Sequence, residues 1–303
     1  MSPPASHWVI AIALASIALP LTAQSVYKIK NPDGTVSYTD RKPASLDGVQ
    51  VIRARAENQS LVNLRVDGDG IRRQAVASNL IDGPLQIELQ LQGAVNVASE
   101  PALPLRVVLP AHSTRTLATI QHADPRQPAR FGVAMRAVPG DPAARPDDTV
   151  YLLPLDTRAW RIDQGYGGAF SHNDAASRHA VDFAVAEGTP VLAAREGVVM
   201  QVEAHFDGAG LDREKYGSRA NHIRILHGDG TMAVYAHLQP DSVLVRPGAR
   251  VRRGQHIGNS GNTGFSTGPH LHFAVQVNRD MELVSVPFRL EGPGGTVSIP
   301  GAP

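Results

Sequence analysis

Short runs of alternating apolar and polar residues recur along the chain and predict strands rather than helices. Between about residues 59 and 155, the segments LQIELQLQG, LPLRVVLPAH and RFGVAMRAVPG are separated by Gly, Pro and Asp breakers. Several strands at this spacing are typical of a β-sandwich, so we expect a β-sandwich-like domain over residues 59–155. Ahead of it, VYKIKNPDGTVSYTDRKP alternates on both sides of an Asn-Pro-Asp-Gly turn signal and predicts a small hairpin module over residues 24–58.

The two ends of the chain carry different signals. The Pro- and Asp-rich segment PGDPAARPDD predicts a linker into a last domain over residues 156–290, and we expect residues 291–303 to form a flexible tail. At the front, an apolar stretch from Trp8 to Leu21 is short of the about 20 residues that a membrane span takes. It predicts a signal peptide over residues 1–23, with an uncleaved anchor as the alternative. Both place the protein outside the cytoplasm, and after cleavage we expect no membrane span.

Composition narrows the chemistry. The 303 residues include no cysteine, which excludes disulfides, thiolate zinc sites and a cysteine nucleophile, so any metal must be held by His, Asp or Glu. The formal net charge of +1 gives no electrostatic ground for a nucleic-acid partner. Nine of the twelve histidines lie between His172 and His272. This concentration indicates a site in the last domain.

The motif HLHF places His270 and His272 two positions apart in a predicted strand. Residues i and i+2 of a strand point to the same face, so the two imidazoles can converge while Leu271 enters the core. A metal pair on a helix would instead be spaced at i and i+4. The alternative interpretation is a pair of solvent-facing histidines on an exposed strand.

Asp182 lies inside the apolar run AVDFAVA, where an unpaired carboxylate would be costly to bury. It therefore needs a partner, and a metal ion is a good candidate. His172 and His179 could each add a ligand, and strand alternation favours His172 because it sets His179 on the face opposite Asp182. His237, in YAHL at the end of a predicted strand, is a candidate general base or transition-state donor, or else a histidine that caps a turn.

Taken together, these motifs resemble those of a known family. His172 with Asp182, YAHL at 235–238 and GNSGNTGFSTGPHLHF at 258–273 are similar to the motifs of the lysostaphin/LytM-type zinc metallopeptidases, which cut the peptide part of peptidoglycan. The resemblance covers about residues 164–288. It implies an antiparallel β-sheet whose groove holds the metal.

The resemblance also implies a role for each residue. One zinc ion would be held by His172, Asp182 and His272, which leaves a fourth tetrahedral position for water, as in catalytic zinc sites. His237 and His270 would be the catalytic histidines, one moving the proton and the other stabilising the oxyanion. The implied function is a zinc endopeptidase acting on peptidoglycan stem or cross-link peptides. The implied location is the periplasm or cell envelope, since the hairpin module resembles one found in periplasmic proteobacterial proteins.

Some features of the sequence depart from the family pattern. Arg178 stands where many members have the first ligand, so that ligand must come from further upstream. A polar insertion over residues 205–220 is expected to form one wall of the groove, whereas His222 and His227 are expected to belong to the scaffold.

The main rival function is that of a non-catalytic LytM-like regulator that binds cell wall or activates another hydrolase. A biotinyl or lipoyl carrier, suggested by VRPGARVRRGQHIG, would need a lysine at a hairpin tip, whereas Lys215 lies in the insertion.

Overall fold

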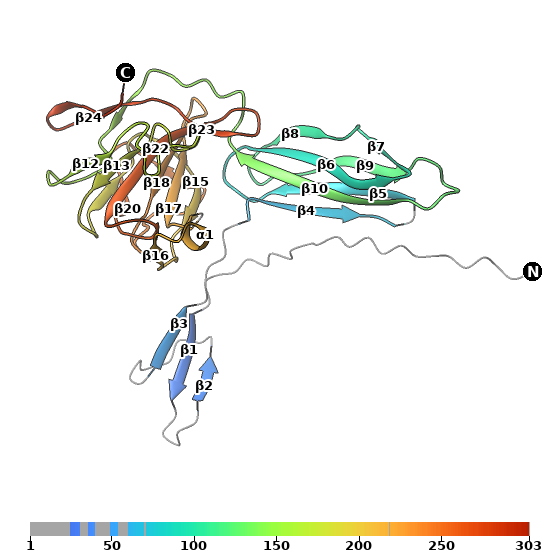
Figure 1. Ribbon diagram of the computed structural model, residues 1–303, viewed down its shortest axis with the longest axis horizontal. Coiled ribbons are helices and arrows are strands. Elements are labelled where there is room, and N and C mark those ends of the chain that lie inside the picture. The colour runs from blue at the N-terminus through green and yellow to red at the C-terminus, as the bar shows by residue number, and fades with distance from the viewer. Residues whose placement is uncertain are drawn as a thin grey trace, which may run out of the picture.

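The chain folds almost entirely into strands, as its computed structural model shows. The ranges that the structure describes, the first three as backbone only, are 25–30, 36–39, 49–53, 60–69, 71–217 and 219–302. About half of the described residues lie in strands and 2% in a helix, so the expected mainly β class is confirmed. A small N-terminal sheet, an elongated middle body and a larger C-terminal body follow one another (Figure 1). In these ranges, no helix is long and apolar enough to span a bilayer.

The N-terminal sheet has three antiparallel strands in the order β2-β1-β3. Their bounds are β1 Ser25–Lys30, β2 Val36–Thr39 and β3 Val49–Arg53. Strands β1 and β2 pair in antiparallel fashion, with Tyr27 opposite Thr39. The predicted turn between them and the predicted signal peptide lie outside the described residues.

The middle body consists of two antiparallel sheets that enclose a core. One sheet has the order β4-β5-β9-β7, and its strands are β4 Val62–Asp67, β5 Arg72–Asn79, β9 Thr114–His122 and β7 Val97–Glu100. The other has the order β10-β6-β8, with β10 Arg130–Pro139, β6 Leu85–Val95 and β8 Leu105–Leu109. Alternation sends Ala75, Ile87, Leu89 and Ile120 into the shared core, where each is at most 1% exposed. We call this body the sandwich.

The C-terminal body is built on one antiparallel sheet. In order across the sheet, its strands are β12 Arg161–Gln164, β13 Val181–Ala184, β22 His270–Asn278, β18 Met232–Ala236, β17 His222–Leu226, β15 Gly197–Glu203 and β19 Arg250–Val251, with β23 Leu283–Ser285 paired to β22. Smaller pairs surround it: β14 Pro190–Leu192 with β20 His256–Asn259, and β16 Ala209–Gly210 with β21 Gly264–Phe265. The helix in this body, α1 Arg213–Tyr216, has four residues.

Alternation along β22 separates a core face from a site face. Leu271, Phe273 and Val275 are at most 1% exposed and pack in the core of the C-terminal body. Burying each of these side chains stabilises the fold by about 1.5–3 kcal/mol. His270 and His272 point to the opposite face, as the sequence predicts, because successive residues of a strand alternate between faces.

The structure differs from the expected domain limits at both ends of the last domain. Tyr151, in β11 Val150–Leu152, is buried in the core of the C-terminal body rather than in the sandwich. Strand β11 pairs with β24 Arg289–Gly292, which continues through an antiparallel pair to β25 Gly295–Val297. The flexible tail expected over 291–303 is therefore wrong for the described residues: β25 is paired and Ile299 is only 8% exposed. The physical reason is this long-range strand pairing, which a local Gly- and Pro-rich composition does not reveal.

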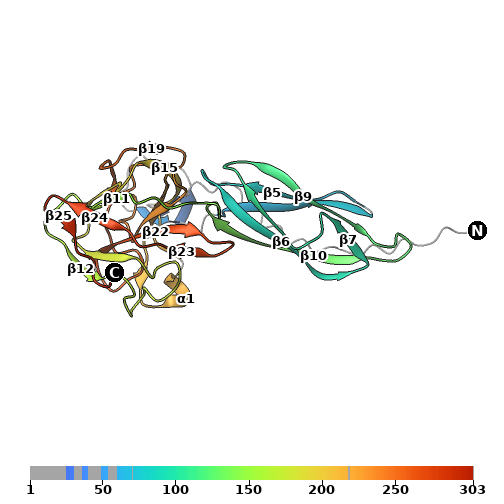
Figure 2. The ribbon, with the colours of Figure 1, turned by 90° about the horizontal axis from the view of Figure 1, so that it is seen from above.

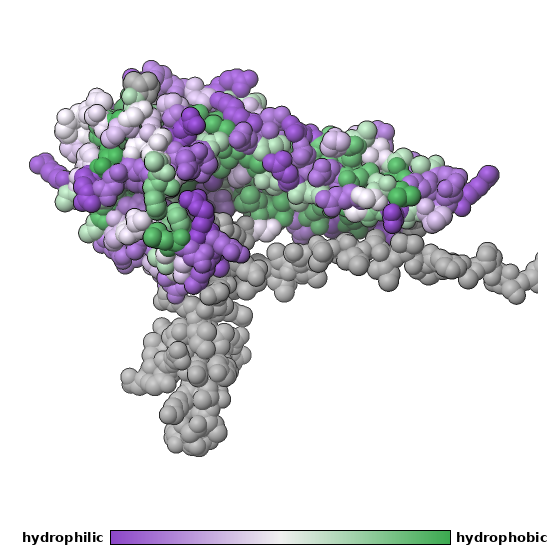
Figure 3. Space-filling view, in the orientation of Figure 1, coloured by the Kyte–Doolittle hydropathy of each residue, from purple (hydrophilic) through white to green (hydrophobic). Residues whose placement is uncertain are grey.

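The sandwich packs against one end of the C-terminal sheet, and the two bodies lie end to end (Figure 2). Met200 and Met232 come from the C-terminal sheet, yet both are fully buried in the core of the sandwich. Gly83 and Gly140 make this approach possible, since a Cβ atom would lie 2.8 and 2.7 Å from the two methionine side chains. Figure 3 shows hydrophobic residues gathered near this junction, among the hydrophilic residues of the C-terminal body.

His227 makes the stability of this fold depend on pH. Its Nδ1–H donates to the Glu196 carbonyl at 2.7 Å, whereas Nε2 is buried without a partner. Burial lowers the pKa of His227 to about 4. The unfolded chain takes up this proton near pH 6.5, so stability is full above pH 6.5 and falls as the pH drops towards 4, by roughly 3 kcal/mol.

We expect His227→Asn to reduce this acid-induced loss of stability, because the amide keeps a donor for Glu196 but does not titrate. Denaturant unfolding at pH 7.5 and 4.5 measures the loss. Burial also lowers the pKa of His222 to about 4, so the variant still loses part of its unfolding free energy as the pH falls. The control is His256→Asn, at an exposed position. An equal loss of unfolding free energy between pH 7.5 and 4.5 in wild type and His227→Asn would contradict the expectation.

Candidate active site

The site lies in one row of residues across the C-terminal sheet. By strand register, Gln164 stands opposite Asp182, Asp182 opposite His272, His272 opposite Ala236, and Ala236 opposite His222. Directly paired residues of neighbouring strands point to the same face. Five strands therefore bring their side chains together on the site face.

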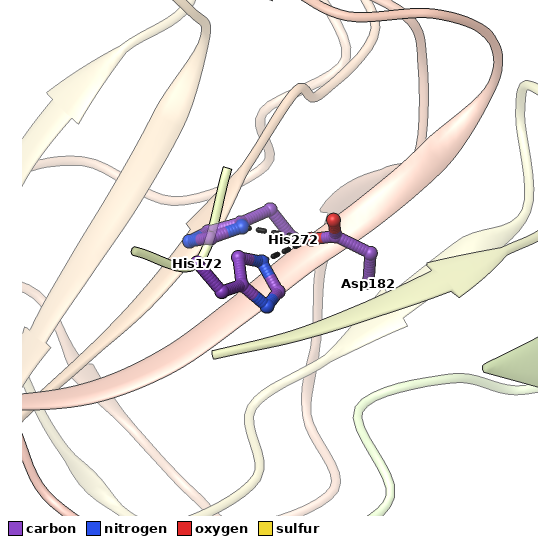
Figure 4. A group of neighbouring side chains, drawn as sticks. All are labelled: His172, Asp182 and His272. Atoms are coloured by element: carbon purple, nitrogen blue, oxygen red, sulfur yellow. Dashed lines mark hydrogen bonds and ion pairs between the residues drawn. The ribbon is translucent and has the colours of Figure 1, made fainter. Parts of the chain in front are cut away.

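His172, Asp182 and His272 form a compact group of potential metal ligands, with one donor atom from each lying within 4.8 Å of the others. Figure 4 shows the two imidazoles directed at the carboxylate from a loop and from β22. Oδ1 of Asp182 is 3.2 Å from Nε2 of His172 and 2.8 Å from Nδ1 of His272. Two imidazole nitrogens and one carboxylate oxygen fit zinc, whose catalytic sites use three such protein ligands.

Neighbouring groups hold these side chains in place. The Nδ1–H of His172 donates to the Gly165 carbonyl at 2.8 Å, which leaves Nε2, the nitrogen that contacts Asp182, as the one directed at the ligand group. Gln164 donates from Nε2 to the second oxygen of Asp182 at 3.0 Å. Burial would raise the pKa of Asp182, but hydrogen bonds from His172 and His272 outweigh it and hold this pKa well below its usual value. The carboxylate is therefore ionised and ready to bind a cation.

His237 and His270 lie beside this group, with ring centroids 4.4 Å apart. Nδ1 of His237 is 2.6 Å from the Thr263 carbonyl, and Nδ1 of His270 is 2.8 Å from the Gly268 carbonyl. A carbonyl only accepts, so each Nδ1 carries the hydrogen and each Nε2 of the neutral ring is a free acceptor. Burial lowers the pKa of His237 to about 3 and also lowers that of His270. Both imidazoles are thus neutral, the form that can accept a proton.

Other histidines are placed as follows. His179 turns away from the metal ligands, with Nδ1 2.9 Å from the Ser285 carbonyl and its ring against Tyr166. The structure thus brings His172, rather than His179, to Asp182. His222, which the sequence assigned to the scaffold, lines the groove instead. Its strand register with Ala236 explains this, and spacing along the sequence alone does not show it.

Four residues of this row line a groove of about 590 Å³: Asp182, His272, Ala236 and His222. The 205–220 insertion lines it, as expected, through Arg213, Tyr216, Gly217, Arg219 and Ala220. Phe170 and Phe265 also line the groove, and their rings stack with centroids 5.6 Å apart. Every lining residue falls between Arg161 and His272, so in the described ranges the sandwich lines none of the groove.

Sequence reasoning missed the groups that orient the site. Gln164, Gly165, Thr263 and Gly268 each hold one of the key side chains by a hydrogen bond. Three of these four act through a backbone carbonyl, which any residue type provides. The sequence carries no signal for these three carbonyls. Gln164 could have been suspected from its place in a polar-apolar alternation.

The known proteins that resemble this chain match only part of it. The sequence profile of peptidase family M23 matches residues 176–282. The chain is 41% identical over 98 residues to an uncharacterized metalloprotease of Haemophilus influenzae, which covers 32% of this chain and 18% of that protein. It is 38% identical over 127 residues to the peptidoglycan DD-endopeptidase ShyA of Vibrio cholerae, covering 41% and 26%. Among solved structures, the peptidase lysostaphin from Staphylococcus simulans is 35% identical with a TM-score of 0.31, covering 39% of this chain and 43% of that one.

The matched region spans about a quarter or less of the length of these two curated relatives. The M23 match contains Asp182, His237, His270 and His272, and it begins just after His172. The resemblance drawn from the motifs is confirmed, and the chain carries a domain of peptidase family M23.

Proposed function

We propose that this chain is a zinc-dependent endopeptidase that hydrolyses amide bonds in the peptide cross-links of peptidoglycan, outside the cytoplasm. The observation that carries the proposal is the pairing of two neutral imidazoles, each with a free Nε2, beside three potential zinc ligands. The M23 match and the likeness to a DD-endopeptidase support the substrate class. Action on peptidoglycan in turn supports export to the periplasm or cell envelope.

In this proposal, His172, Asp182 and His272 hold the zinc ion. The bound ion would polarise the scissile carbonyl and lower the pKa of a water molecule towards about 7. His237 and His270 move the proton: a free Nε2 takes it from the attacking water and returns it to the nitrogen of the leaving amine as the C–N bond breaks. An imidazole that holds this proton also donates a hydrogen bond to the oxyanion.

The test uses the full chain after removal of the predicted signal peptide. Zinc content is measured by elemental analysis, and peptide release is measured on isolated sacculi before and after a chelator. We expect one zinc per chain, loss of cross-linked muropeptides, and recovery of activity when zinc is returned. A zinc-loaded chain that leaves the cross-links intact would instead support the non-catalytic regulator.

A further inference from the structure

A buried arginine that lines the groove has no acidic partner among the described residues. Arg224 is 8% exposed, lies on β17 and lines the groove. Its Nη1 donates to Oε1 of Gln276 at 2.7 Å, whereas its Nε is buried without any partner. In the described part of the chain, no carboxylate forms an ion pair with it. Burial lowers the pKa of Arg224 to about 10, so the guanidinium still carries its charge at neutral pH.

Strand register fixes where this charge lies relative to the metal ligands. Arg224 stands opposite Val234 and Val234 opposite Ala274, one row beyond the row of His272 on the same face. Neighbouring rows on one face are two residues apart, or about 6.6–6.8 Å. An extended peptide advances about 3.3–3.6 Å per residue. Two strand spacings of about 4.7–4.9 Å also separate β17 from β22. The Cα atoms of Arg224 and His272 therefore lie about 12 Å apart, the length of three to four residues of an extended peptide.

The next row on this face is closed. Met232 lies there opposite Leu226, and it is buried in the core of the sandwich. Arg224 thus occupies the last open row between the metal ligands and the junction with the sandwich. A buried charge without a partner is costly, and a carboxylate that completes its hydrogen bonds offsets this cost.

From this placement we infer that Arg224 is a specificity-determining residue that binds a free carboxylate of the substrate peptide, within about four residues of the cleaved bond. The inference rests on the proposed peptidase function. Two groups on a stem peptide could supply this chemistry, the carboxylate at its C-terminal end or a carboxylate on the side chain of a diamino acid. Both present the planar pair of oxygens that a guanidinium binds with two hydrogen bonds.

The test compares synthetic stem peptides that differ by a single carboxylate. One pair ends in D-alanine as the free acid or as the carboxamide, and the other carries meso-diaminopimelate or lysine at its third position. Binding is measured by calorimetry on the full, zinc-loaded chain with the His270→Ala change, which keeps the peptides intact. We expect the free carboxylate to bind roughly tenfold more tightly in at least one pair, and that pair identifies the source.

Variants then assign the preference to Arg224. In the same background, Arg224→Gln should bind both members of the pair equally, Arg224→Lys should keep part of the preference, and Arg213→Gln, at the groove wall, should keep all of it. A purely structural arginine would change the melting temperature and leave the ratio of affinities unchanged.

Equal affinity for both members of each pair, absence of binding, or a ratio that survives Arg224→Gln would overturn the inference. The comparison of peptides in the parent protein stands even if Arg224→Gln does not fold. A clear carboxylate preference together with intact sacculi would count against the proposed peptidase function alone.

Discussion

Replacing His270 by alanine is expected to lower peptide release from sacculi by about 100-fold or more, while one zinc remains bound per chain. Nε2 of His270 is 4.0 Å from Oδ1 of Asp182, beside the proposed ligands. Its Nδ1 is engaged by the Gly268 carbonyl, so the change removes a proton acceptor and leaves the ligand atoms of the metal group in place. Elemental analysis and the rate of muropeptide release, measured on the same preparation, check both parts.

A matched control is available in His179→Ala. This histidine lies in the same body and also bonds a backbone carbonyl, but it points away from the groove. The control should keep both zinc and activity. If His270→Ala lost its zinc together with its activity, His270 would have to be counted among the ligands.

Asp182→Asn is expected to weaken zinc binding by more than about 100-fold, and activity with it. Oδ1 of Asp182 faces nitrogens of both His172 and His272, so the anionic oxygen at the centre of the group is lost. The amide is nearly the same size but neutral, and even residues that only support a metal ligand are worth 10–100-fold in affinity. Competition with a chromogenic chelator measures the dissociation constant.

The control for this change is Asp163→Asn, which alters a carboxylate that also lines the groove but pairs with Arg161. It should bind zinc like the wild type. Thermal unfolding of the metal-free proteins shows whether Asp182→Asn is folded. A folded Asp182→Asn chain with wild-type zinc affinity would remove Asp182 from the proposed ligand set.

Local patterns predicted those parts of the site that lie within single strands. HLHF indicated that His270 and His272 share a face, and the structure agrees, with Leu271 fully buried between them. The carboxylate of Asp182 within an apolar run indicated a buried partner, and two imidazoles lie there. Both inferences use only the two-residue period of a strand, which the sequence displays directly.

Features that depend on pairing between distant strands could not be predicted in the same way. Arg224 and His222 reach the groove because β17 pairs with β18 in one particular register. The linker before the last domain is another example, since Arg195 bonds both Asp147 within it and Asp229 at a distant turn. Charge and spacing in the sequence do not specify which of many possible partners such a residue meets.

The parallel pair of β11 and β24 joins the beginning of the C-terminal body to its end. A fragment cut to the M23 match, residues 176–282, would lack both strands, together with His172 and the buried Phe288. Its sheet would have an uncovered edge and its metal group only two of three donors. Any piece that keeps this body whole must therefore run at least from β11 to Ile299, about 1.4 times the length of the matched segment. Met200 and Met232 would still lose their cover without the sandwich.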